Sequence, residues 1–195
     1  MHVRALALAL LLFAPAPAAA DWQMKPFLGL TFGGDTTFVD LERAAGSPNV
    51  VVGLGGVLLG EVIGVEVDFG YGPGFFQSGD QTLVRVGSAT TLTGNFVVAW
   101  PRRMSEYTLR PYFVTGVGLM HVRIDDWLDL LKVADTLPAV DLGGGATGFL
   151  SDRVGLSWDV RRFRSVGGRN EGRGVSFGRE RLSFWRATMA VAIRY

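Results

Sequence analysis

The residue types that carry most enzyme chemistry are scarce in this chain of 195 residues. It holds no cysteine, and His121 is its only histidine after position 2. A hydrolase or acyltransferase needs a nucleophile in contact with a base, and a third group that orients the base. Ser176 and Ser183 are candidate nucleophiles, but nothing in the sequence brings either of them to His121. We therefore predict no catalytic residue and no enzyme, with a lipid-acting enzyme centred on His121 as an alternative.

Metal and cofactor sites are suggested only weakly. Asp125, Asp126 and Asp129 are acidic neighbours that suggest calcium, but the EF-hand pattern is absent. The glycine-rich stretch 141–148 is typical of a strand, and no helix follows it to complete a phosphate-binding loop. The formal net charge is +1, and no basic stripe points to nucleic acid. We predict no metal, no cofactor and no nucleic-acid partner.

Most of the remaining charged residues lie in segments where polar and apolar residues alternate. In 62–76 the odd positions hold bulky apolar residues, namely Val65, Val67, Phe69, Tyr71 and Phe75. The even positions hold Glu66, Asp68 and glycines. Side chains alternate across a strand, so such a segment is a two-faced β-strand. Eight segments fit a strand: 22–33, 49–60, 62–76, 83–100, 108–124, 139–151, 153–165 and 181–195.

The connections between these segments alternate in length. Those over 34–48, 123–138 and 166–180 are long and polar, and the one over 77–82 is modest. Those over 60–61, 101–107 and 151–153 are shorter. Long loops at one rim and short turns at the other are typical of an up-and-down barrel. We predict an all-β, eight-stranded antiparallel transmembrane β-barrel.

Two barrels fit this alternation, and they differ in which face meets the solvent. A soluble, lipocalin-like barrel places its apolar residues inside, whereas a membrane barrel places them outside. Here the polar faces carry the glycines, and small residues suit a narrow interior. Four aromatic residues at strand ends are typical of the girdles at the two membrane interfaces: Trp22, Trp100, Trp185 and Tyr195. The membrane barrel is therefore favoured.

The polar faces then become the interior, which we expect to hold charges of both signs with a modest basic excess. They are Lys25, Glu66, Asp68, Arg85, Arg110, Asp159, Arg161 and Arg186. One interpretation is an ion-pair network that satisfies the buried charges and fills the lumen. The other is a charged constriction in a channel. We favour the network, because eight strands leave an interior only wide enough for side chains.

The first twenty residues have the pattern of a cleaved signal peptide. His2 and Arg4 give a basic start, 5–14 is apolar, and Ala18 and Ala20 form an A-x-A site. The apolar run is too short to span a bilayer. We expect residues 1–20 to be removed and 21–195 to form the barrel domain.

Two connections have features of their own. Within 125–138, Asp125 or Asp126 is placed to cap a short helix on the rim, with Trp127, Leu131 and Ala134 on one side. The stretch 167–174, followed by Arg179 and Arg181, is a basic loop. It is either simply solvated or in contact with phosphates of the outer-leaflet glycolipid.

Several of these stretches resemble a known family. The final "MAVAIRY" resembles the C-terminal sorting signal of bacterial outer-membrane proteins, although Tyr195 replaces the usual phenylalanine. "VIGVEVDFGYGPGFF" and "LRPYFVTGVGL" resemble strands of small eight-stranded barrels of the OmpX and OmpA-transmembrane type, the outer membrane protein beta-barrel domain proteins.

The resemblance implies a monomer in the outer membrane of a Gram-negative cell envelope. Its partners would be membrane lipid, glycolipid, and the barrel-assembly machinery through the C-terminal strand. The family includes structural anchors, adhesion proteins and small pores. We expect a structural or surface-interaction role without catalysis, with a pore or transport aid for small solutes as the first alternative.

Overall fold

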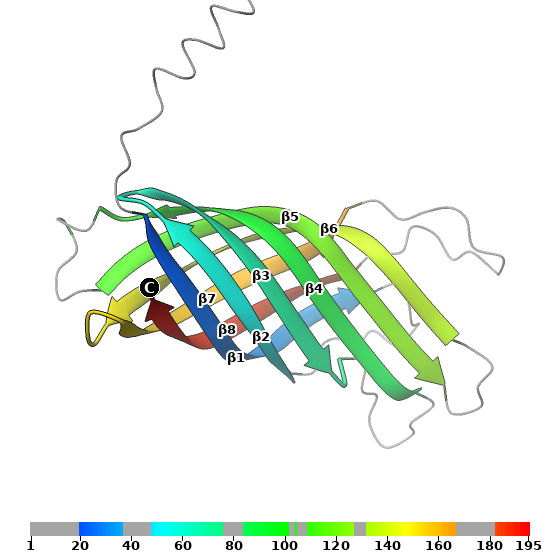
Figure 1. Cartoon of the computed structure of the whole chain (residues 1–195). Coiled ribbons are helices and arrows are strands. Elements are labelled where there is room, and N and C mark those ends of the chain that lie inside the picture. Colours follow the sequence, from blue (N-terminus) through cyan, green and yellow to red (C-terminus); the bar gives the residue numbers. More distant parts are fainter. Residues whose placement is uncertain are drawn as a thin grey trace, which may run out of the picture.

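The protein is a closed barrel of eight antiparallel strands in the computed structural model (Figure 1). The structure describes residues 20–36, 48–75, 84–101, 104, 109–126, 132–166 and 182–195. Each strand pairs with its neighbours in the chain, and β1 pairs with β8 to close the sheet. The predicted up-and-down barrel is confirmed. The strands are β1 (Asp21–Thr36), β2 (Asn49–Leu59), β3 (Ile63–Pro73), β4 (Val84–Ala99), β5 (Leu109–Asp126), β6 (Lys132–Phe149), β7 (Val154–Ser165) and β8 (Leu182–Arg194).

The pairing register tilts the strands steeply. A path that follows directly paired residues around the barrel starts at Leu59 on β2 and returns to β2 at Asn49, ten residues away. In between it passes through Gly64, Val97, Val114, Gly143, Arg161, Arg186 and Thr31. Such an offset is the shear that a closed barrel requires. With eight strands, it gives an interior that side chains fill.

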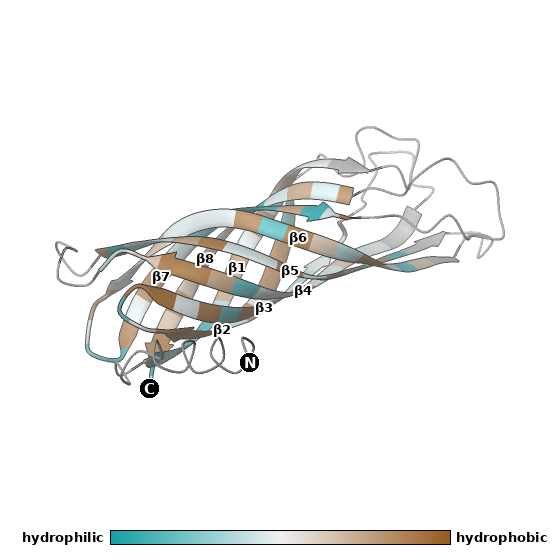
Figure 2. Cartoon of the chain, turned by 90° about the horizontal axis from the view of Figure 1, so that it is seen from above, coloured by the Kyte–Doolittle hydropathy of each residue, from teal (hydrophilic) through white to brown (hydrophobic). Residues whose placement is uncertain are grey.

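The apolar residues face outward. On β3, Val67 is 59% exposed, whereas the flanking Glu66 and Asp68 are 3% and 1% exposed. The same inversion follows the other strands, and Figure 2 shows apolar and polar residues alternating along the wall. In the part of the chain that the structure describes, no helix is long and apolar enough to cross a bilayer.

The short turns lie at one end of the barrel, which we call the lower end. The turns there are closed by backbone hydrogen bonds from Gly60 to Ile63 and from Leu150 to Val154, both at 2.9 Å. The C-terminus lies at the same end (Figure 1), where the amide of Tyr195 donates to the carbonyl of Trp22 at 3.0 Å. The opposite, upper end carries the ends of the strands that the longer segments join.

The helix predicted within 125–138 is wrong. Residues 125–126 end β5 and residues 132–138 begin β6, and these two ends pair directly, Asp125 with Lys132 and Arg123 with Ala134. Residues 127–131, including Trp127 and Leu131, lie outside the described residues. From 134 to 138 burial varies along the strand, with Leu137 buried and its neighbours Thr136 and Pro138 exposed. The pairing with β5 satisfies the backbone hydrogen bonds of this segment as an extended hairpin.

We expect the outward face near mid-depth to tolerate charged residues poorly. Val67→Arg places a charge near mid-depth on the lipid side and should cost about 2–4 kcal/mol of unfolding free energy, against about 0–1 kcal/mol for Leu150→Arg at the lower turn. Urea titration of the protein refolded in lipid vesicles measures both. Equal stability of Val67→Arg and the parent protein would show that the two faces are assigned the wrong way round.

Candidate functional site in the barrel interior

A buried arginine links two opposite strands at mid-height in the barrel. The guanidinium of Arg161 on β7 donates to both carboxylate oxygens of Glu66 on β3, at 2.9 and 3.1 Å. It also donates to Asp159 Oδ2 at 2.8 Å. Arg161 is 1% exposed, so these bonds replace the water that the charge gives up. Buried charges are tolerated when they are paired and hydrogen-bonded in this way.

A second buried arginine lies directly beside the first. Arg186 on β8 pairs with Arg161 in the register, and its Nη2 lies 2.8 Å from Asp68 Oδ1, as a charge contact rather than an aligned hydrogen bond. Its guanidinium lies between two aromatic rings, 4.8 Å from the centroid of Phe27 and 4.6 Å from that of Phe163. Cation–π contacts of this kind are stronger where water is excluded.

The interior carboxylates are themselves hydrogen-bonded by neutral donors. Asp159 accepts from the hydroxyls of Tyr112 at 2.9 Å and Thr188 at 3.0 Å. Glu66 accepts from the amide of Asn95 at 3.3 Å. These donors come from β4, β5 and β8, so the network reaches most of the barrel wall.

The sequence analysis missed one member of this network, Asp141 on β6. Asp141 is 2% exposed, and its Oδ2 lies 3.9 Å from Arg161. The alternation of side chains along β6 indicates an inward position for Asp141, because Val140 and Leu142 on either side of it face outward. We call Glu66, Asp68, Asp141, Asp159, Arg161 and Arg186 the charge cluster. Carboxylates predominate in it, so the expected basic excess does not hold at its centre.

Above the charge cluster, the interior is apolar. Phe184 stacks on Phe163 with ring centroids 5.3 Å apart, and meets Phe75 edge-on at 4.9 Å. The buried group, which we call the apolar plug, comprises Phe75, Ala89, Met120, Val122, Ala139, Phe163, Leu182 and Phe184. These residues lie towards the upper ends of their strands, so the plug closes the lumen above the charges.

The structure corrects the position predicted for Phe75. The alternation along 62–76 predicted that Phe75 faces outward with Val67 and Phe69, but its side chain is only 1% exposed. β3 ends at Pro73, and Gly74 adopts a φ of 70°. This left-handed conformation suits glycine and turns the chain, so the strand parity no longer applies at Phe75.

Below the charge cluster the interior is more open, and it holds both polar and apolar side chains. Lys25 Nζ lies 3.4 Å from Thr147 Oγ1 and 4.8 Å from the centre of the Tyr112 ring. A cavity of about 450 Å³ extends from these residues to the lower turn at 150–152. At its rim, Arg110 donates to the carbonyls of Trp100 at 2.8 Å and Gly60 at 3.1 Å. We call this space the lower cavity.

The remaining predicted residues lie as follows. Arg85 is on β4, and its side chain is outside the described residues. The four girdle aromatics face outward, with Trp22, Trp100 and Tyr195 at the lower end. Trp185 lies further up β8, paired with Phe32 of β1.

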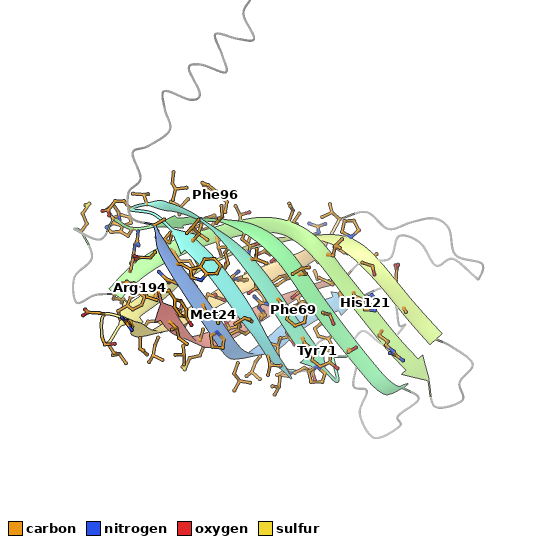
Figure 3. The ribbon with its side chains drawn as sticks, in the orientation of Figure 1. Met24, Phe69, Tyr71, Phe96, His121 and Arg194 are labelled. Atoms are coloured by element: carbon orange, nitrogen blue, oxygen red, sulfur yellow. The ribbon has the colours of Figure 1, made fainter. Side chains whose placement is uncertain are left out.

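Among the described residues, neither candidate serine lies beside His121. The Nδ1 of His121 lies 2.9 Å from the hydroxyl oxygen of Thr136 on the neighbouring strand. His121 faces outward. It lies towards the opposite end of the barrel from Arg194 (Figure 3). Ser183 is on β8, which does not border β5, and Ser176 lies outside the described residues. Among the residues described, no group of three or more acidic, histidine or cysteine side chains is placed to hold a metal, and Asp129 is not among them.

Comparison with known proteins agrees with this architecture. Residues 5–178 match the family described as outer membrane protein beta-barrel domain. The chain belongs to this family. The bacterial outer membrane is the location that the family indicates, as the strand pattern and the C-terminal residues predicted. No curated protein matches the chain.

Solved structures of small outer-membrane barrels share the fold. Neisserial surface protein A is 9% identical, with a TM-score of 0.60 over 90% of this chain and 97% of that one. OprG from Pseudomonas aeruginosa is 11% identical, with a TM-score of 0.59 over 91% and 97%. The barrel domain of OprF from the same organism is 12% identical, with a TM-score of 0.52 over 90% and 97%. At these identities the likeness concerns the fold alone.

The packing around Arg186 makes Gly70 a sensitive position. A Cβ at Gly70 would lie 2.7 Å from Arg186 Nη1 and 2.9 Å from Thr91 Oγ1, whereas one at Gly56 would have only Trp22 nearby, at 3.7 Å. Gly70→Ala should therefore cost about 1–3 kcal/mol of unfolding free energy through overpacking. Gly56→Ala is the matched control and should be within about 0.5 kcal/mol of the parent. Equal effects in urea titrations would contradict the position of the guanidinium.

Proposed function

We propose that the protein is a non-catalytic barrel of the outer membrane that holds its long connecting segments at the cell surface for structural or surface contacts. The observation that carries this proposal is the filled interior. Along β7 alone, the inward side chains run from Ser157 through Asp159 and Arg161 to Phe163. The interior of the barrel is thus occupied by charges at mid-height and by the apolar plug above them. This filling favours a structural scaffold over an open channel.

The outward face supports contact with glycolipid. Arg162 and Arg164 project outward from the upper half of β7, and the Arg162 guanidinium lies 5.5 Å from the ring centre of Trp185. Arginines at the membrane interface extend their charged ends towards anionic headgroups. We propose that these arginines and the basic stretch 167–181 meet phosphates of the outer leaflet.

Export and assembly complete the proposal. Residues 1–20 act as the cleaved signal peptide, and the barrel-assembly machinery engages the C-terminal strand with its final Tyr195. The protein works as a monomer within lipid. The apolar outward face of β8, where Met189 is 63% and Val191 42% exposed, supports direct contact with lipid.

Ion conductance separates this proposal from the pore alternative. Parent protein reconstituted in planar bilayers should show no resolvable steps, because the charge cluster and the apolar plug occupy the path an ion would take. Heat-modifiable gel mobility of the same sample verifies folding, and a general porin serves as the conducting control. Stable single-channel steps whose ion selectivity changes in Glu66→Ala would instead establish a pore.

A further inference from the structure

The lower cavity has the properties of a binding site with one predominant sign of charge. Its volume of about 450 Å³ lies within the range of small-molecule pockets. Three cations line it, Lys25, Arg110 and Arg194, against one carboxylate, Asp152. It reaches the exposed turn residues 150–152 at the lower end, which faces the periplasm in barrels of this class.

Lys25 is held mainly by neutral partners, although the charges of Glu66 and Asp159 act on it from the charge cluster. Arg110 donates to backbone carbonyls, and Arg194 lies 3.3 Å from Asp21. Lys25 is 7% exposed, and its ammonium has one long hydrogen bond, to Thr147, and the Tyr112 ring. No carboxylate of the described residues lies within 4.0 Å of it. A buried ammonium in this state is stabilised by any anion that reaches it.

A second buried group lines the same space. Gln23 is 2% exposed and lines the cavity, and its Oε1 accepts no hydrogen bond within the part of the chain described. Buried amide oxygens are normally satisfied. An unfilled acceptor on Gln23, two residues along β1 from an ammonium with only one long hydrogen bond, favours a polar ligand group placed between the two side chains.

Most of the remaining lining is apolar, and this defines the body of the ligand. Val57, Leu59, Val97 and Ala99 from β2 and β4 form one wall, and Phe149 of β6 adds an aromatic ring. Such walls gain free energy by burying hydrocarbon. Polar groups fix the orientation, and apolar walls provide most of the contact, as in ligand pockets generally.

We propose that the lower cavity binds a small organic monocarboxylate with an apolar body, taken up from the periplasmic side. The carboxylate accepts a hydrogen bond from Lys25 Nζ. A water molecule, or a hydroxyl group of the ligand beside the carboxylate, donates a hydrogen bond to Gln23 Oε1. One negative charge matches the single free ammonium. A second would face the carboxylates of Glu66 and Asp159 in the charge cluster above, so a dianion is disfavoured.

Benzoate is a suitable probe, because it joins one carboxylate to a compact apolar ring. Titration into folded protein in lipid nanodiscs, followed by ligand-observed NMR, should give saturable binding. Lys25→Met keeps the length of the side chain, removes its charge, and should weaken binding by at least about tenfold. Arg123→Met removes a cation from the outward face of β5 and is the matched control, which should bind as the parent does. Benzyl alcohol, which lacks the charge, should not compete.

A second variant keeps the test independent of how Lys25→Met folds. Ala99→Phe narrows the cavity from its wall without touching the ammonium and should abolish saturable binding. The proposal is overturned if benzoate does not saturate the parent. It is also overturned if Lys25→Met and Ala99→Phe bind like the parent, or if Arg123→Met weakens binding as much as Lys25→Met does.

Discussion

The structure depends on the pairing of Arg161 with Glu66 inside a barrel too narrow for bulk water. At mid-height an eight-stranded wall leaves room for little besides side chains, so a charge that points inward there must find its partner among the other inward side chains. Arg161 from β7 meets Glu66 from β3 on the far side of the lumen and Asp159 on its own strand. The pair joins opposite sides of the wall, which the backbone ladder cannot do because it links neighbouring strands only.

This constraint organises the interior into layers. Arg186 extends the charges to Asp68 and at the same time presents its guanidinium face to Phe163. Phe163 in turn stacks on Phe184 in the apolar plug, so one arginine connects the charged layer to the apolar one. Below, the hydroxyl of Tyr112 bonds to Asp159 while its ring lies against Lys25. The wall accommodates these large groups by glycine at the facing positions, as at Gly70 beside Arg186.

The strands and their two faces could be predicted from the sequence, because a strand repeats every two residues and lipid demands apolar groups at every outward position. The alternation of side chains correctly predicted that Glu66 and Arg161 face the interior. It failed at Phe75, where Gly74 turns the chain, and over 132–138, where polar residues at the membrane edge concealed a strand. The apolar plug and the partners of each charge depend on contacts between strands distant in sequence, and alternation within one strand carries no information on those contacts.

Charges at mid-height and aromatic rings above them occupy the barrel interior, whereas the lower cavity, lined by Lys25 and Gln23, reaches the turn at the opposite end. The two roles that we propose, surface contact and small-molecule binding, therefore lie at opposite ends of one molecule.

A double-mutant cycle on Arg161 and Glu66 tests the central claim most directly. Arg161→Met and Glu66→Gln each strand a buried partner, whereas the double variant removes both charges. The unfolding free energies of the four proteins in lipid vesicles should give a coupling of about 1–3 kcal/mol, with the double variant more stable than the sum of the single losses predicts. Strictly additive losses of unfolding free energy would show that the interaction between Arg161 and Glu66 does not stabilise the barrel.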